Sequence, residues 1–287
     1  MMRRGLFSFV TLFAAGFLTS CQSSQTTPAP TAKEVIPTTT ATTDKRLKEA
    51  TAALIRMDYS TAAAIWRPLA EQGNPAAEVG MGKLYDSGLG VPKDPVQATA
   101  WFQRAADQDF AEGECTLGLR YVEGLGVPLR DVSQGLALMK KAADQGNGGC
   151  AESIGELYRN GLFSVPKDTV QAAAWHRRGA ELGDVLAENR LGIDYQFGIG
   201  VPQDLTQAAD WYRKAAEQTR TDAEQGNVAA QLRLGDAYEM GMMGLSRDKA
   251  AALYWCRKAA QQESRIKSFA EQCAARVASE PAAAETK

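Results

Sequence analysis

The sequence predicts an all-α solenoid of about five helix-pair repeats. One Tyr recurs with spacings of 36, 37, 37 and 43 residues, at Tyr85, Tyr121, Tyr158, Tyr195 and Tyr238. An Asp follows each Tyr and opens a segment whose small and apolar residues fall at helical spacing. Ala is abundant and β-branched residues are sparse in this region, which favours helix. Because no single unit of this length can bury its apolar face alone, the units are expected to stack.

The first half of each repeat predicts a helix that ends in a glycine-rich turn. A Gly stands three residues before each Tyr, at Gly82, Gly118, Gly155, Gly192 and Gly235. An aliphatic residue or Met precedes each Gly, and a turn such as Gly-Leu-Gly-Val-Pro at 88–92 follows the Tyr. We name this first helix of each repeat helix A.

The second half of each repeat predicts a capped amphipathic helix, helix B. The capping residues are Asp94, Asp131, Asp168, Asp204 and Asp248, and four of them have Gln three residues later. Counted from each Asp, small or apolar residues occupy positions +4, +7, +8, +11 and +12, which lie on one helix face. The +7 column reads Trp101, Leu138, Trp175, Trp211 and Trp255.

The predicted solenoid occupies residues 45–279. Residues 45–73 are expected to form an N-terminal half-unit in which Trp66 and Leu69 stand in for helix B, and residues 263–279 a C-terminal capping helix. Residues 280–287 are expected to be a disordered tail.

Together these columns resemble the SEL1-like repeat, a relative of the tetratricopeptide repeat. The resemblance covers most of residues 45–262 and recurs five times. It implies a right-handed α-solenoid that serves as a protein-interaction scaffold, and it leaves the partner open.

The N-terminus predicts a lipoprotein signal peptide over residues 1–20. Arg3 and Arg4 precede an apolar run over 6–18 that is too short to cross a bilayer. The run ends in Leu-Thr-Ser-Cys, which resembles the bacterial lipobox and implies that Cys21 is lipidated. The alternative is an ordinary cleaved signal with a chance cysteine nearby.

Residues 21–44 are expected to be the lipidated Cys and a disordered tether, because this Thr- and Pro-rich stretch has almost no large apolar residue. Gln22, rather than Asp, follows the Cys, which by the sorting rule implies the outer membrane, facing the periplasm. Without Arg3 and Arg4 the chain has 30 basic against 34 acidic residues and no basic block, which argues against a nucleic-acid partner.

The sequence offers no recognisable catalytic, metal or cofactor motif, so we expect no enzyme and no cofactor. The one histidine, His176, falls in the +8 column of helix B and is interpreted as a partly buried packing residue. The Gly-x-Gly-Val-Pro turns follow a helix and lack the Lys-Ser/Thr ending of a phosphate loop.

Four cysteines follow Cys21, at Cys115, Cys150, Cys256 and Cys273, and three pairings are possible. A Cys115–Cys150 bond would join neighbouring A helices, and a Cys256–Cys273 bond would pin the capping helix; free buried thiols are the alternative. The cysteine-rich branch of the family implies a second function, the binding or hydrolysis of cell-wall or β-lactam compounds. This chain lacks the regular cysteine pairs of that branch.

The predicted partner-binding surface is a stripe on helix A. Positions −6, −2 and +1 from each Tyr share one helix face, and the matching positions of tetratricopeptide relatives line the concave groove. The candidate residues are Lys83, Asp86, Leu119, Val122, Glu152, Glu156, Arg159, Asn189, Gln196, Asp236 and Glu239. The hypothesis is an apolar pocket with an acidic rim, suited to a periplasmic or envelope protein with an apolar anchor and basic residues. An ordinary solvated helix face is the alternative.

Overall fold

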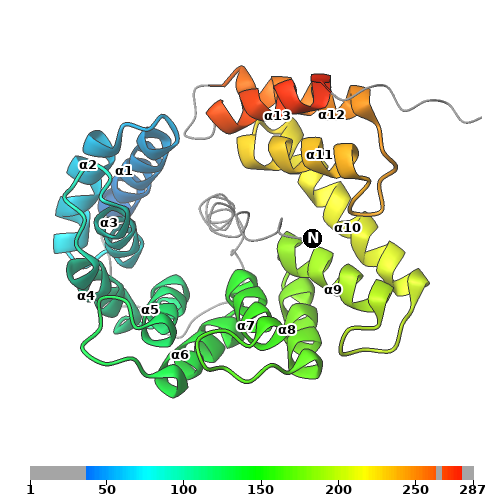
Figure 1. Ribbon diagram of the computed structural model, residues 1–287. Helices are drawn as coiled ribbons and strands as arrows, with labels where there is room; N and C mark the ends of the chain where they lie inside the picture. The colour runs from blue at the N-terminus through cyan, green and yellow to red at the C-terminus, as the bar shows by residue number, and fades with distance from the viewer. Residues whose placement is uncertain (1–36, 263–266, 280–287) are drawn as a thin grey trace, which may run out of the picture. The chain divides into compact units, whose positions relative to one another are not determined.

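The computed structural model describes residues 37–262 and 267–279, and in these ranges every regular element is a helix (Figure 1). The helices are α1 (Pro37–Ile55), α2 (Tyr59–Glu71), α3 (Pro75–Ser87), α4 (Pro95–Ala106), α5 (Ala111–Glu123), α6 (Val132–Asp144), α7 (Gly148–Asn160), α8 (Thr169–Glu181), α9 (Val185–Phe197), α10 (Leu205–Glu224), α11 (Val228–Met240), α12 (Lys249–Ala260) and α13 (Lys267–Ser279). The predicted signal peptide, Cys21 and the tail at 280–287 lie outside the described residues.

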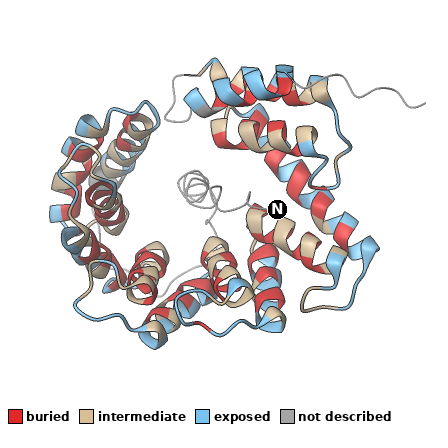
Figure 2. Cartoon of the chain, in the orientation of Figure 1, coloured by how far each residue is buried: buried red, intermediate tan, exposed pale blue. Residues whose placement is uncertain are grey.

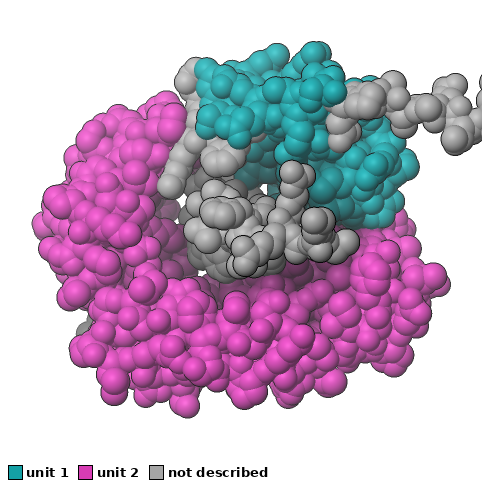
Figure 3. Space-filling model, viewed as in Figure 1, with its two compact units in different colours: residues 1–34, 216–287 teal, residues 35–215 magenta. Residues whose placement is uncertain are grey.

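The helices belong to two compact units, coloured separately in Figure 3. One unit, here called the larger unit, spans residues 35–215 and holds α1 to α9 with the first half of α10. The other, the smaller unit, takes in residues 216–287 and holds the rest of α10 with α11 to α13. In the larger unit the A helices form one layer and the B helices the other.

The predicted helix caps are confirmed. The carboxylates of Asp94, Asp131, Asp168 and Asp248 each accept a hydrogen bond from a backbone N–H in the first turn of helix B. The same residues close the turn behind helix A, because the N–H of Asp94 donates to the carbonyl of Tyr85 at 2.8 Å and the other repeats keep this bond. Each A helix ends at a left-handed glycine, such as Gly88 with φ 69°.

In each repeat the +8 side chain of helix B packs against the glycine of helix A that stands three residues before the Tyr. These side chains are Phe102, Met139, His176, Tyr212 and Cys256, and all are buried. Figure 2 colours each helix by burial and shows that buried and exposed residues alternate along it. A Cβ on the facing glycine would clash with each of the +8 side chains. The glycine three residues before each Tyr is therefore the space that the +8 side chain fills.

Two helices, α1 and α2, precede the first repeat, in the region where the sequence predicted a half-unit over residues 45–73. Helix α1 begins at Pro37, so residues 37–44 of the predicted tether are helical. Pro37 suits a first helical turn, and no Gly or Pro interrupts the helix before Ile55. Ala50 and Ala53 are buried against α2, and Leu47 packs on the same core, so this helix has an apolar face of its own.

The insertion that stretches the last Tyr spacing is absorbed by helix α10, which has 20 residues where the other B helices of the repeats have 12 or 13. The predicted C-terminal helix is present as α13, which packs on α12 through Cys273 and Val277. No helix in the described ranges is long and apolar enough to span a membrane.

The glycine contact predicts that Gly192→Ala is destabilising. The new Cβ would lie 2.6 Å from the rigid ring of Tyr212, and such overpacking costs about 1–3 kcal/mol. The matched control is Gly149→Ala in α7, where the nearest atom is 3.5 Å away and the Ala should stabilise the helix by about 0.5–1 kcal/mol. Urea unfolding midpoints measure both, and equal midpoints for the two variants would contradict the proposed contact.

Candidate functional site

The eleven candidate residues on the A helices are here called the A-helix stripe. Five of them, Lys83, Asp86, Glu152, Glu156 and Arg159, form ion pairs with the next A helix along the chain. In the first repeat, Lys83 Nζ lies 2.5 Å from Glu112 Oε1, and Asp86 Oδ2 lies 2.5 Å from Arg120 Nη2. Arg120 is largely buried and its guanidinium also lies over the ring of Phe102. These bridges link α3 to α5 and fix the charged side chains of the stripe.

The apolar pocket predicted in the second repeat is smaller than expected. Val122 is fully buried against Gly135 of α6, so it cannot contact a partner. Helix α6 covers it because Gly135 has no side chain to hold the two helices apart. Leu119 is half-buried and remains accessible in part. The apolar contribution of this repeat is therefore Leu119 alone among the candidates.

The acidic rim predicted in the third repeat is neutralised. Arg190 of α9 lies 3.6 Å from Glu152 and 3.1 Å from Glu156, both on α7. Arg159 forms a second bridge between these helices, 2.9 Å from Asp194. Glu152 is itself buried. Burial, opposed by Arg190, raises the pKa of Glu152 to about 7.

His176 joins this network from helix α8 and is fully buried, deeper than the sequence indicated. Its Nδ1 lies 2.6 Å from Asp194 Oδ2, and its Nε2 lies 3.6 Å from Glu156 Oε1. Burial disfavours the imidazolium, but the hydrogen bond to Asp194 and the nearby carboxylate of Glu156 outweigh this effect and raise the pKa of His176. Despite a Glu–His–Asp arrangement, a solute cannot reach the ring, so the arrangement holds helices together.

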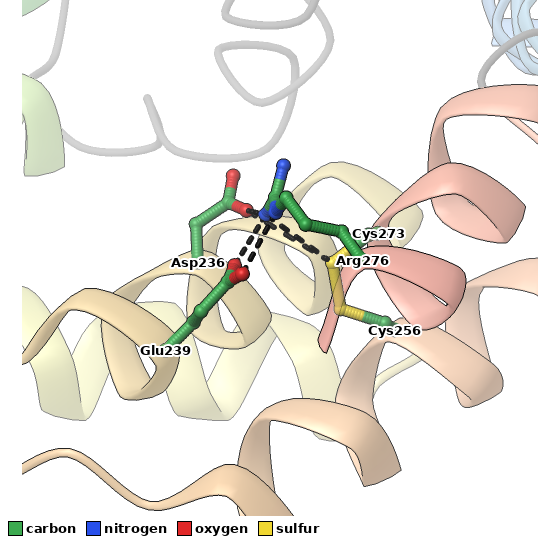
Figure 4. The surroundings of a disulfide bond; sticks show 5 residues. All are labelled: Asp236, Glu239, Cys256, Cys273 and Arg276. Atoms are coloured by element: carbon green, nitrogen blue, oxygen red, sulfur yellow. Dashed lines mark hydrogen bonds and ion pairs between the residues drawn. A yellow bond between two sulfur atoms is a disulfide. The ribbon is translucent and has the colours of Figure 1, made fainter. Parts of the chain in front are cut away.

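The fifth repeat forms its bridges with the capping helix. Arg276 of α13 donates to Asp236 at 2.6 Å and to Glu239 (Figure 4). Asp236, Glu239 and Cys273 lie close enough to surround a cation, but Arg276 already lies against both carboxylates and Cys273 is bonded to Cys256. This cluster therefore does not fit a metal ion.

The structure pairs the cysteines as Cys115–Cys150 and Cys256–Cys273, one of the three pairings that the sequence left open. The first bond joins α5 to α7, with Cα atoms 5.8 Å apart. The second joins α12 to α13, with Cα atoms 5.7 Å apart. The first bond thus links the A helices of two successive repeats, and the second links the last B helix to the capping helix.

The two remaining candidates, Asn189 and Gln196, are half-buried on α9. Gln196 Oε1 accepts a hydrogen bond from the hydroxyl of Tyr212 at 2.6 Å, which fixes its side chain. The bridging residues Glu112, Arg120 and Arg190 were missed in the sequence. Each of them carries the charge opposite to that of a candidate residue in the preceding repeat. This pattern could be found in the sequence only by comparing neighbouring repeats with one another.

Comparison with known proteins shows the family. The sequence model described as Sel1 repeat matches residues 75–110, 111–147, 151–184, 185–219 and 228–264. The chain belongs to the Sel1 repeat family. The five matches cover more than half of the chain and confirm the all-α solenoid of five repeats.

Two curated relatives match over most of this chain. Chitin synthase regulatory factor 3 of Schizosaccharomyces pombe is 25% identical over 208 residues, 72% of this chain and 18% of the relative. Protein sel-1 homolog 2 of Mus musculus is 30% identical over 204 residues, 71% of this chain and 25% of the relative. The chain thus spans a quarter or less of the length of these relatives.

A solved structure shares the fold. The immunity protein from Pseudomonas aeruginosa superposes with a TM-score of 0.55 at 22% identity, covering 82% of this chain and 86% of that chain. At this identity the likeness concerns the fold alone.

The buried network predicts that stability falls as the pH rises from 6 to 8.5. The raised pKa values of His176 and Glu152 mean that, as the pH rises through this range, the folded state still holds protons that the unfolded chain has already released or releases at lower pH. The stabilisation is complete below the unfolded pKa of each group and is lost as the pH rises through the folded pKa.

Urea midpoints should therefore correspond to a loss of about 1–2 kcal/mol between pH 6 and pH 8.5. His176→Phe, which introduces the side chain found at Phe102 in the first repeat, should flatten the slope. A wild-type protein that is equally stable at both pH values would contradict the prediction.

Proposed function

We propose that this chain is a non-enzymatic scaffold, anchored to the bacterial cell envelope through a lipidated Cys21, that binds a protein partner on its A-helix stripe. Membership of the Sel1 repeat family supports the scaffold role. The name of the fungal relative, a regulatory factor, also fits a protein that acts on others by binding. The partner is a periplasmic or envelope protein.

The sequence of the leader supports the anchor. Arg3 and Arg4, the apolar run at 6–18 and the Leu-Thr-Ser-Cys ending have the order that lipoprotein processing requires. Gln22 favours the outer membrane, facing the periplasm. The two disulfides fit an oxidising compartment.

The fixed side chains of the stripe support the partner site. The bridges of Lys83, Asp86 and Arg159 hold long side chains in one arrangement before any partner binds, which lowers the entropy cost of association. Because Arg190 neutralises the carboxylates of α7, a basic peptide is no longer the favoured ligand. A surface of mixed charge around Leu119 is better matched by a partner with both signs and one apolar anchor.

The non-enzymatic role is supported by the burial of His176, which Asp194 and Glu156 hold away from solvent. The observation that carries the whole proposal is the ion-paired stripe itself, since it is a preformed surface made by the repeats. The proposal assigns no cofactor.

Cys21→Ser should release the protein from the membrane. The variant cannot accept acyl chains on a thiol, and the helices in the described ranges supply no membrane span. Labelling cells with an alkyne fatty acid, followed by fractionation, measures both effects. The wild type should carry the label in the membrane fraction, and an unlabelled wild type would contradict the anchor.

Leu119→Asp should weaken partner capture at least tenfold, because it places a carboxylate at the apolar point of the stripe. The matched control is Ala137→Asp, an exposed position on helix α6 of the same repeat, which should leave capture unchanged. Quantitative crosslinking in intact cells measures both variants. Unchanged capture by a folded Leu119→Asp protein would contradict the site.

A further inference from the structure

Exposed large apolar side chains gather in the larger unit at the turns that join an A helix to the following B helix. They lie at the ends of the A helices, in the turns that follow, or in the first turn of the B helices. Examples are Leu125, Leu129, Phe163, Val170, Phe197 and Leu205. Leu129 is 77% exposed, Leu205 66% and Phe197 64%.

These turns adjoin one another along the stack. The hydroxyl of Thr99, in the first turns of α4, donates to the carbonyl of Leu125 at 3.2 Å. Arg130 Nη2 donates to the carbonyl of Phe163 in the next repeat at 3.1 Å. Each A-to-B turn therefore lies against the neighbouring repeat at the same end of the helices. We call the surface that these turns of the larger unit present the A–B edge.

The opposite edge of the larger unit is polar. Its B-to-A turns present side chains such as Gln108, Asp109 and Gln145. Among the residues that the structure describes there, these turns hold none of the exposed large apolar side chains. Scattered apolar side chains would be ordinary on any surface, but their concentration on one edge marks an interaction site.

The charges on the A–B edge identify the partner that fits it. Each of three successive turns places an exposed basic residue directly before the capping Asp, at Lys93, Arg130 and Lys167, and these recur at intervals of 37 residues. Positive and negative side chains therefore alternate along the A–B edge. An anionic lipid surface would attract only the basic residues and would meet the carboxylates of Asp131 and Asp168.

When the A–B edge of a second copy lies antiparallel to the first, its acidic residues can face basic residues of the first copy. Its apolar side chains can likewise pack against apolar side chains. The second edge also has the same interval between turns, so one matched contact brings the others into register. Such a two-fold contact is isologous and closes at two chains. We propose that two copies of this chain associate through their A–B edges in an antiparallel dimer.

The proposal does not depend on the lipid anchor or on the A-helix stripe, and it can be tested on the full chain in cells. Two copies with different epitope tags are produced together, with p-benzoylphenylalanine in place of Leu129 or of Phe197. Control positions are Gln72 and Asp144, which are exposed on the polar edge. After irradiation, the edge positions should give a covalent species of twice the chain mass that carries both tags, and the controls should not.

A crosslink only to another protein, a crosslink only to lipid, or no crosslink at the edge positions would each overturn the dimer. So would equal yields of the doubly tagged species from the edge and the control positions.

A pair of charge variants tests the contact itself. Phe197→Glu should lower the yield of the Leu129 crosslink at least tenfold, because the isologous contact would bury two new carboxylates against apolar side chains. Gln72→Glu, at an exposed position in a turn of the polar edge, should leave the yield unchanged. Phe197 is mostly exposed, so the variant should keep the wild-type melting temperature, which circular dichroism checks. An unchanged yield with Phe197→Glu would overturn the proposal.

Discussion

The approach of helix B to a glycine of helix A is the contact on which every repeat depends. A side chain at the +8 position fills the space that a Cβ would take, and the two helices can then bury their small residues against each other. Ion pairs inside the repeat follow from this approach: Glu78, fully buried in α3, lies 3.0 Å from Arg104 of α4, and Glu188 lies 2.8 Å from Lys214. Charges buried this deeply are tolerated because each has its partner within reach.

The +8 side chain occupies the same place in every repeat, and its identity decides which kind of interaction holds the helices together there. Phe102 and Met139 supply apolar packing. His176 occupies the same position and can bond Asp194 only because its ring is directed into the junction between repeats, where carboxylates of both neighbouring A helices meet. Cys256 is too small to fill the space alone, and its bond to Cys273 brings in the capping helix. Apolar, ionic and covalent links thus replace one another along the stack.

The bridges between successive A helices change how the surface can recognise a partner. When the charges of a single repeat are considered alone, α7 contributes two carboxylates and the surface is acidic. When the neighbouring helices are included, Arg190 of α9 neutralises these carboxylates. Arg276 of α13 likewise neutralises Asp236 and Glu239. A long-range bridge of this kind costs little entropy in a folded repeat array, because both helices are already held by their glycine contacts. Recognition by the stripe therefore rests on a fixed pattern of both charges.

The sequence by itself determined the repeat, the capping Asp residues and the glycine turns, because these features are periodic and their hydrogen bonds close within a few residues. Only the tertiary structure decided that Val122 is fully buried, that Glu156 meets Arg190, and which cysteines pair. It also placed the start of α1 at Pro37, in a stretch whose composition favours disorder. These outcomes depend on the rotation of each helix and on neighbours some 35 residues away, and neither is encoded in the pattern of a single repeat.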